Sequence, residues 1–331
     1  MIIIKPAPDF IASQPWWPKD NEQWSALSQQ ATEQKRLLQF THQANQQAHT
    51  EGMPVDKLIG AYATVVDHLL CHAWLNHGLD KIGASLLAVG GYGRGELHLH
   101  SDVDLMILLA DNCDEDGKQQ IGEFLTALWD TGLDIGYSVR TLGETVIEAT
   151  NDITVITSLL ETRILSGNQT LFDALLTATA SDQIWSSAEF YFAKKEEFLA
   201  RHAKYGDTVY QLEPNIKEGP GGLRDIQFID WISKRHFNTK SLNDLVGAGF
   251  ISSEEYQQLQ QVREHLWEVR FLLHQNNTRK EERLLFDQQI MLAKDIETTS
   301  DEPNAAIEQF MQNHYRQIGT CAQLIKVLMG H

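Results

Sequence analysis

One stretch of the chain, LLAVGGYGRGELHLHSDVDLMILL at residues 86–109, constrains the fold more than any other. It contains two short apolar runs, 85–89 and 102–110, whose length and composition predict strands. Gly90 and Gly91 end the first run, and Asp102 and Asp104 open the second. Because alternate residues of a strand point to the same face, both carboxylates are expected to project together from the start of the second strand.

Two neighbouring carboxylates repel each other unless a cation lies between them. A hard cation such as Mg²⁺ prefers oxygen ligands and also binds phosphate oxygens, and a Gly-Gly turn lets the backbone approach a phosphate closely. The combination predicts a metal-dependent phosphoryl- or nucleotidyl-transfer site. The alternative interpretation is an ordinary turn, with Ser101 and Asp102 as its capping residues.

The rest of the chain predicts an α+β domain followed by an all-helical one. Residues 54–78 and 117–129 carry a helical period, and DIGYSVRT at 134–141 predicts a third strand. After Thr141 the pattern is almost wholly helical, most clearly at 251–277. The expected division is an N-terminal helical extension (1–53), a small domain of strands and helices that contains the predicted transfer site (54–150) and a helical domain (151–331).

A second informative segment is the glycine-rich loop EPNIKEGPGGLRD at 213–225, which leads into a predicted helix. Free backbone N–H groups and the helix dipole would attract an anion there. Gly221, Gly222, Lys217 and Arg224 are therefore candidate nucleotide-binding residues. The alternative is a tight interhelical turn, held by an internal pair between Arg224 and Asp225.

Composition excludes several classes of protein. A formal charge of −18 argues against a protein that coats nucleic acid. No run of eighteen apolar residues predicts a membrane span, and the N-terminus does not read as a signal peptide. Three widely separated cysteines are typical of a reduced, cytoplasmic protein.

These motifs resemble a known family. A strand ending in Gly-Gly, then about ten residues, then Asp-Val-Asp-Leu, is similar to the signature of the DNA polymerase beta superfamily of nucleotidyltransferases. This resemblance implies that residues 54–150 form a small mixed-sheet nucleotidyltransferase domain. From about residue 50 to the C-terminus, the chain resembles the N-terminal part of the bacterial PII uridylyltransferase/uridylyl-removing family. The motifs that carry this resemblance occur in order: GGYGRGELHLHSDVDL, GYSVRTL, DITVITSLLETRIL, EPNIKEGPGGLRDIQFIDW, RFLLHQNNTRKEERLLFDQQIMLA and EQFMQNHYR.

The resemblance implies transfer of UMP from UTP to a tyrosine of the nitrogen-signalling protein PII, with Mg²⁺ or Mn²⁺. It makes Asp102 and Asp104 the metal-binding pair, and Gly90 and Gly91 the phosphate-side turn. The superfamily adds a third carboxylate, for which Asp134 is the candidate; an ordinary helix-to-strand turn is the alternative for this residue.

Two further residues near the turn are candidates for nucleotide contact, Arg94 and Ser101. Arg94 follows the Gly turn and is expected either to meet the triphosphate or to face solvent. An adenylyl- or guanylyltransferase is the nearest alternative function, because these residues do not show which nucleotide base is bound. A catalytically idle nucleotide-binding or interaction module is the alternative from another class.

Full-length members of the resembling family add a His-Asp hydrolase domain and two ACT domains. This sequence contains no His-Asp dipeptide. We therefore expect those domains, and with them uridylyl-removing activity, to be absent from it.

Overall fold

The structure of the protein is a computed structural model, which describes residues 5–111, 113–239, 241–296 and 303–330. The chain divides into two compact units, Met1–Ile184 and Trp185–His331. Each unit is described by itself. The mixture of a small sheet with many helices confirms the predicted α+β class.

A four-stranded mixed sheet forms the centre of the first unit, in the order β3-β2-β1-β4. β1 runs antiparallel to β2 and to β4, whereas β2 and β3 are parallel. The three strands predicted from the sequence are all present. The strands are β1 (Ala84–Ala88), β2 (Val103–Leu109), β3 (Ile135–Thr141) and β4 (Arg163–Gly167).

β4 lies in a region that the sequence predicts to be helical. Its five residues, RILSG, contain only Ile164 and Leu165 as apolar members, so they carry no legible period. They become a strand because they pair with β1, with a register shift between Leu86 and Leu87. The sheet and the first compact unit therefore extend beyond residue 150, the boundary expected from the sequence.

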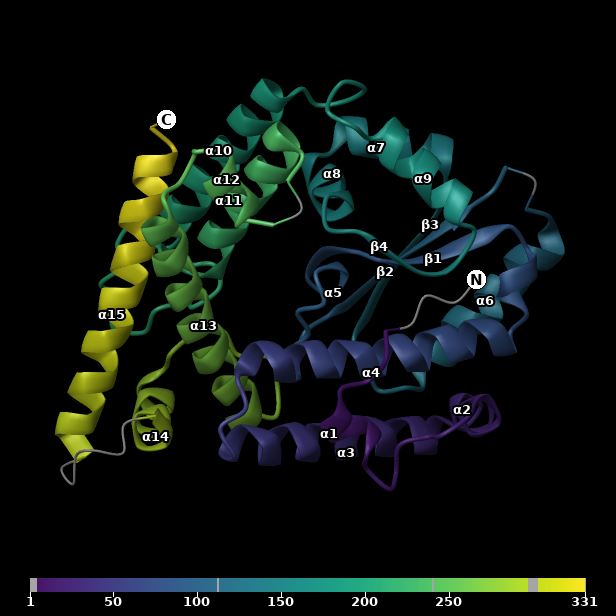
Figure 1. The fold of residues 1–331 in the computed structure, drawn as a ribbon, viewed down its shortest axis with the longest axis horizontal. Coiled ribbons are helices and arrows are strands. Elements are labelled where there is room, and N and C mark those ends of the chain that lie inside the picture. The colour runs from purple at the N-terminus through teal and green to yellow at the C-terminus, as the bar shows by residue number, and fades with distance from the viewer. Residues whose placement is uncertain (1–4, 112, 240, 297–302, 331) are drawn as a thin grey trace. The chain divides into compact units, whose positions relative to one another are not determined.

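Helices cover both faces of this sheet (Figure 1). α4 and α6 lie on one face, and α7, α8 and α9 lie on the other. The N-terminal helices pack on α4, so the predicted helical extension is part of the first unit. The helices are α1 (Asp9–Ala12), α2 (Asn21–Ser28), α3 (Ala31–Thr50), α4 (Val55–Asn76), η1 (Leu79–Lys81), α5 (Gly90–Gly93), α6 (Glu115–Trp129), α7 (Leu142–Asn151), α8 (Ile153–Leu159) and α9 (Gln169–Ala178).

α4 is the central core helix of the first unit. Of the helices in the described part of the chain, only α4 is long and apolar enough to cross a membrane. Within its most apolar window, 83% of the residues are buried inside the protein. Its apolar side chains pack with Val103, Leu105 and Ile107 of β2 in one hydrophobic cluster, which accounts for its composition.

The second unit is helical throughout its described residues. The predicted helix at 251–277 is observed as α13, and Ser252 and Glu255 form a capping box at its start. The helices are α10 (Ser187–Lys204), α11 (Leu223–Phe237), α12 (Asp244–Gly247), α13 (Ser253–Asn276), α14 (Phe286–Ile296) and α15 (Pro303–Leu328).

Candidate active site

The two predicted carboxylates lie at the start of β2. Asp102 precedes the strand and Asp104 is its second residue, with the fully buried Val103 between them. Val103 points into the hydrophobic cluster beneath the sheet, so Asp102 and Asp104 point to the opposite face. Both are half-buried. This geometry agrees with the prediction that both carboxylates project from the same face.

The carboxylate of Asp104 is held between two glycines. A Cβ atom built on Gly90 would lie 3.1 Å from Asp104 Oδ2, and one built on Gly136 would lie 2.8 Å from Oδ1. Gly90 also has a φ of +58°, a left-handed conformation that favours glycine. Gly136 belongs to β3 and was not singled out from the sequence. A lone glycine inside a predicted strand is the signal that could have found it.

Gly90 and Gly91 begin the one-turn helix α5, directly after β1. The backbone N–H of Val89 donates to the Asp104 carbonyl oxygen at 3.0 Å, which joins the turn to β2. The third glycine of the run, Gly93, is also sterically required. A Cβ atom there would lie 2.1 Å from the Glu161 carbonyl oxygen. The glycines therefore allow the turn to pack closely on the Asp104 carboxylate and on the connection before β4.

Asp134, the third predicted carboxylate, directly precedes β3. The backbone N–H of Val103 donates to its carbonyl oxygen at 2.7 Å, and the register pairs Asp104 with Gly136. The register begins at Val103 and Ile135, and continuing it by one pair before these residues puts Asp134 beside Asp102. Cross-strand neighbours point to the same face, so the three candidate carboxylates share one face at one edge of the sheet. Asp134 is exposed.

Ser101 closes a tight turn just before this pair. Its hydroxyl accepts from the backbone N–H of His98 at 3.3 Å, and its own N–H donates to the His98 carbonyl oxygen at 3.0 Å. This is the capping role that the sequence left as an alternative. The turn fixes the chain's entry into β2.

Arg94 is held by two carboxylates. Its Nε donates to Glu96 at 2.9 Å and its Nη1 donates to Glu161 at 2.6 Å. Burial alone would lower the pKa of Arg94, but the charges of Glu96 and Glu161 raise it above its ordinary value. The side chain neither faces solvent nor stands as an unneutralised cation. It ties the Gly turn to the segment before β4, which contradicts the solvent-facing interpretation; contact with a triphosphate stays a prediction.

A second buried ion pair anchors the same turn. Asp67 of α4 accepts from Arg163 of β4 at 2.8 and 2.7 Å, and from the Tyr92 hydroxyl at 2.6 Å. Burial, and then the charge of Asp67, raise the pKa of Tyr92 well above its ordinary value. Sequence reasoning missed this set, since its members lie on three separate elements. Together they fix the Gly turn on the core helix.

In the loop at 213–225 of the second unit, every N–H group from Ile216 to Asp225 donates a hydrogen bond within the unit. The N–H groups of Gly219, Gly222 and Arg224 donate to carbonyl oxygens within the loop. Those of Lys217 and Glu218 donate to the Asn215 side chain. This arrangement is the tight interhelical turn, and it removes the basis on which the loop was expected to attract an anion.

The pairs that hold this loop differ from the expected one. Arg224 donates to Glu218 at 3.0 Å, and the buried Asp225 accepts from Gly221 N–H and Arg201 at 2.7 Å each and contacts His202. Gly221 has a φ of +77°, and a Cβ atom there would lie 2.2 Å from the Ile318 carbonyl oxygen. A Cβ atom on Gly222 would lie 2.7 Å from the Ile216 carbonyl oxygen. Both glycines thus serve packing within the unit.

Lys217 is the candidate of this loop whose charge is least favoured by its surroundings. Burial, and then repulsion by Arg270 and Arg224, lower its pKa to about 8. The side chain is half-buried. A cation in such surroundings is stabilised by an added anion.

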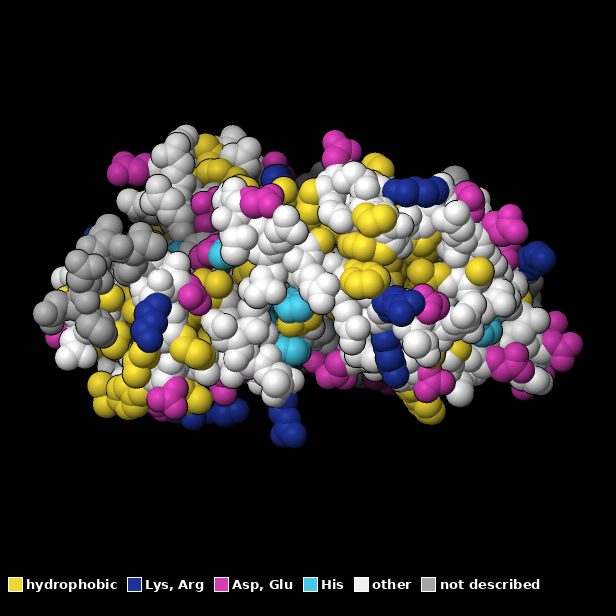
Figure 2. Space-filling model, turned by 90° about the horizontal axis from the view of Figure 1, so that it is seen from below, with side chains coloured by type: hydrophobic (Ala, Val, Ile, Leu, Met, Phe, Trp, Pro, Cys, Tyr) yellow, Lys and Arg dark blue, Asp and Glu magenta, His cyan; other side chains and the backbone are white. Residues whose placement is uncertain are grey.

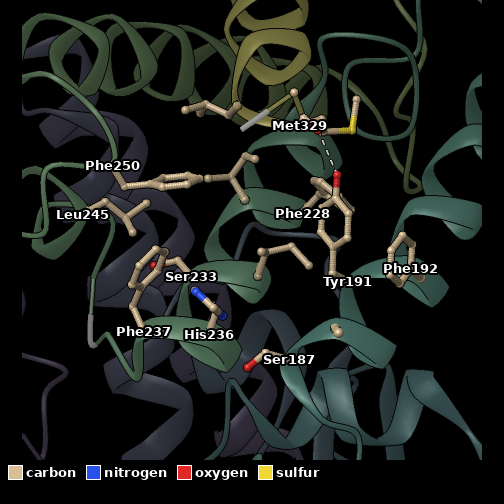
Figure 3. A pocket seen from close by; sticks show the side chains of 15 residues that line it. Ser187, Tyr191, Phe192, Phe228, Ser233, His236, Phe237, Leu245, Phe250 and Met329 are labelled. Atoms are coloured by element: carbon tan, nitrogen blue, oxygen red, sulfur yellow. Dashed lines mark hydrogen bonds between the residues drawn. The ribbon is translucent and has the colours of Figure 1, made fainter.

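The second unit also contains an apolar cavity of about 500 Å³ (Figure 3). Phe228, Phe237, Leu245 and Phe250 are among the side chains around it, and the Tyr191 hydroxyl donates to the Met329 carbonyl oxygen at 2.9 Å. The described residues that line it include no Asp, Glu, Lys or Arg. The cavity therefore lacks the charged groups that phosphoryl transfer requires.

Comparisons with known proteins agree with the division into units. The DUF294 nucleotidyltransferase model matches residues 39–142, and the GlnD PII-uridylyltransferase model matches residues 189–329. The first match contains the Gly turn and all three candidate carboxylates. The second lies wholly inside the second unit.

Curated relatives match most of the chain. Bifunctional uridylyltransferase/uridylyl-removing enzymes of Pseudomonas putida F1, Nitrosococcus oceani and Methylococcus capsulatus are 43%, 45% and 46% identical to the chain. The alignments cover 90%, 84% and 84% of this chain, respectively, and 33%, 31% and 32% of those enzymes. The chain is a homologue of these enzymes. It spans about a third of the length of the curated relatives that it matches.

Proposed function

We propose that the chain transfers UMP from UTP to a tyrosine of PII and releases pyrophosphate. The observation that carries this proposal is the carboxylate pair beside a glycine turn, inside the segment that matches a nucleotidyltransferase family. The uridylyl group and the PII acceptor are taken from the names of the family model and the relatives.

The residues at this site fit a divalent metal ion, for which we propose Mg²⁺ or Mn²⁺. Within the described residues, no group of three or more His, Cys, Asp or Glu side chains could hold a metal ion by itself. Mg²⁺ does not need such a group, since it is commonly bound by one or two carboxylates together with substrate phosphates and water. Asp102 and Asp104 would supply those carboxylates. When bound, the ion would polarise the α-phosphate and neutralise charge on the leaving pyrophosphate.

The chain's own residues would orient the reactants. The glycines of the turn allow the triphosphate to approach the backbone, and Gly136 and Gly90 hold the Asp104 carboxylate in one position. The tyrosine hydroxyl would attack the α-phosphorus, forming the new O–P bond as the bond to the pyrophosphate oxygen breaks. Tyrosine has an ordinary pKa near 10, so the exposed Asp134 carboxylate would accept the hydroxyl proton and release it to solvent.

The second unit would contribute less to nucleotide binding than the sequence predicts. The geometry of Gly221, Gly222 and Arg224 favours a structural role for each of them. Lys217 remains the side chain through which this loop would contact a phosphate, because its charge is disfavoured in the free protein.

The cellular setting belongs to the same proposal. We infer a cytoplasmic enzyme that acts on a protein, without nucleic acid or membrane partners. The net charge of −18 supports the part of this inference that concerns nucleic acid. On the face in Figure 2, acidic and basic side chains of the described residues are interspersed rather than gathered by sign.

The test is to incubate the chain with PII, Mg²⁺ and each nucleoside triphosphate separately, and to weigh the intact PII by mass spectrometry. We expect one UMP per PII subunit with UTP alone, and none with the Asp102→Asn variant. Modification with ATP instead would identify an adenylyltransferase. Nucleotide binding without any transfer, by a folded chain and beside an active full-length relative, would identify an idle binding module.

A further inference from the structure

β3 is an outer strand of the sheet, and it begins at the candidate active site. Within the described residues it pairs with β2 alone, in parallel. The other outer strand, β4, is separated from β2 by β1. β3 is therefore the sheet edge that adjoins the carboxylates.

The backbone groups that β3 directs outward can be assigned from one hydrogen bond. In a parallel ladder, alternate residues of a strand bond to the same neighbour. Because Val103 N–H donates to the Asp134 carbonyl oxygen, Gly136 and Ser138 are directed towards β2, and Tyr137 and Val139 outward. Thr141 has the outward phase, and its N–H indeed donates to the Glu144 side chain rather than to β2.

The composition of β3 permits a further strand, since Arg140 is its only charged residue. The segment IGYSVRT contains no proline or lysine, which are the residues that commonly block exposed edges. Ile, Tyr, Val and Thr instead favour extended backbone. Tyr137 is 46% exposed, and Gly136 is exposed as well.

The strand order also separates the two reactants. The Gly turn follows β1, on one side of β2, whereas Asp134 and β3 lie on the other side. In an in-line displacement, the nucleophile approaches the phosphorus from the side opposite the leaving group. With the pyrophosphate at the Gly turn, the acceptor hydroxyl must arrive from the β3 side.

We propose that the acceptor protein adds an extended, tyrosine-bearing segment to the outer edge of β3. Main-chain hydrogen bonds would supply affinity, as in other cases of strand addition. They would also bring the tyrosine hydroxyl to Asp134 and the carboxylate pair. This proposal rests on the proposed function, because it assumes a polypeptide acceptor.

Residue-resolved amide hydrogen exchange tests the docking directly. The Asp102→Asn variant is mixed with saturating PII, so that no turnover occurs. We expect exchange at Ile135, Tyr137 and Val139 to slow about tenfold or more on binding. Gly136 and Ser138, already bonded to β2, should be protected with or without PII. Binding of PII that leaves the three outward amides unprotected would overturn the proposal.

A matched pair of variants tests the same backbone group in turnover. Tyr137→Pro and Tyr137→Ala both remove the ring, but only proline removes the outward N–H. The KM for PII is expected to be about fivefold to tenfold higher for the proline variant, the effect of one net hydrogen bond. UTP affinity, measured by calorimetry without PII, should be equal in the two variants, which also verifies folding.

The outcomes separate the two proposals. Equal KM values for PII in two variants that both bind UTP would reject docking at β3 while leaving uridylyl transfer intact. If the unsubstituted chain neither binds nor modifies PII, the proposed function itself fails, and the docking proposal fails with it.

Discussion

At the scale of single residues, the glycines next to Asp104 decide where its carboxylate lies. Gly136→Ala would put a Cβ atom 2.8 Å from Asp104 Oδ1, closer than such atoms can approach. We expect transfer activity to fall about tenfold or more, because a displaced carboxylate would no longer hold the reactants in the geometry that the reaction needs. Thermal stability should change little, since Gly136 is exposed.

The control for this prediction is Gly122→Ala in α6, where an added Cβ atom would meet nothing within 4 Å. That variant should retain activity and gain about 0.5–1 kcal/mol in the free energy of unfolding. If Gly136→Ala retains full kcat, the position of the Asp104 carboxylate is not critical.

The buried Tyr92 hydroxyl gives a second prediction at this scale. Tyr92→Phe removes one hydrogen bond from Asp67, which keeps its two bonds to Arg163. The free energy of unfolding, measured with denaturant, should fall by about 1–2 kcal/mol. The control is Tyr137→Phe, at an exposed tyrosine of the same unit. Its free energy of unfolding should fall by less than about 0.5 kcal/mol. Equal losses would mean that the Asp67 contact does not stabilise the turn.

At the scale of elements, the loop before α11 has the composition of a phosphate-binding loop, but it serves as a closely packed turn between helices. NIKEGPGGLRD has the composition of an anion site, but its N–H groups bond to carbonyl oxygens and to Asn215 of the loop itself. Composition alone does not distinguish these uses. The choice depends on how α15 packs, since Ile318 approaches Gly221.

Lys217 in this loop gives a prediction on pH. Its pKa is lowered to about 8, so between pH 8 and its ordinary pKa near 10.4 the unfolded chain binds more protons than the folded one. Stability should therefore rise with pH across that window. Lys217→Met should remove this rise and stabilise the protein at pH 7 by an amount on the order of 1 kcal/mol, after allowance for solvent screening.

Denaturant unfolding at pH 7, 8, 9 and 10 measures the effect. If Lys217 also contacts a phosphate, the same variant should bind UTP more weakly while being more stable. A Lys217→Met chain that is less stable at pH 7 would contradict the unfavourable surroundings inferred for this cation.

At the scale of the whole molecule, the formal charge of −18 predicts a response to salt. Raising the ionic strength from 0.01 to 0.15 M shortens the screening length from about 30 to about 8 Å. Self-repulsion should weaken and Tm should rise by roughly a few degrees. Scanning calorimetry over this range is the measurement. A falling Tm would mean that attractive exposed ion pairs such as Lys118–Glu115 outweigh the repulsion.

Local patterns were sufficient for much of the first unit. The apolar run at 102–110 and the helical periods of α4 and α6 depend only on neighbouring residues, so the sequence shows them. The spacing of Asp102 and Asp104 is local for the same reason. β4 is not, because its five residues become a strand only through pairing with β1.

The sequence by itself determined the α+β class, three strands and the carboxylate pair beside a glycine turn. Tertiary structure decided the partners: Glu161, 67 residues from Arg94, neutralises its charge, and Gly136 lies against Asp104. Tertiary packing also determined that the first unit extends to Ile184. The reason is that backbone period and turn chemistry act over a few residues, whereas the neutralisation of a buried charge depends on segments that only folding brings together.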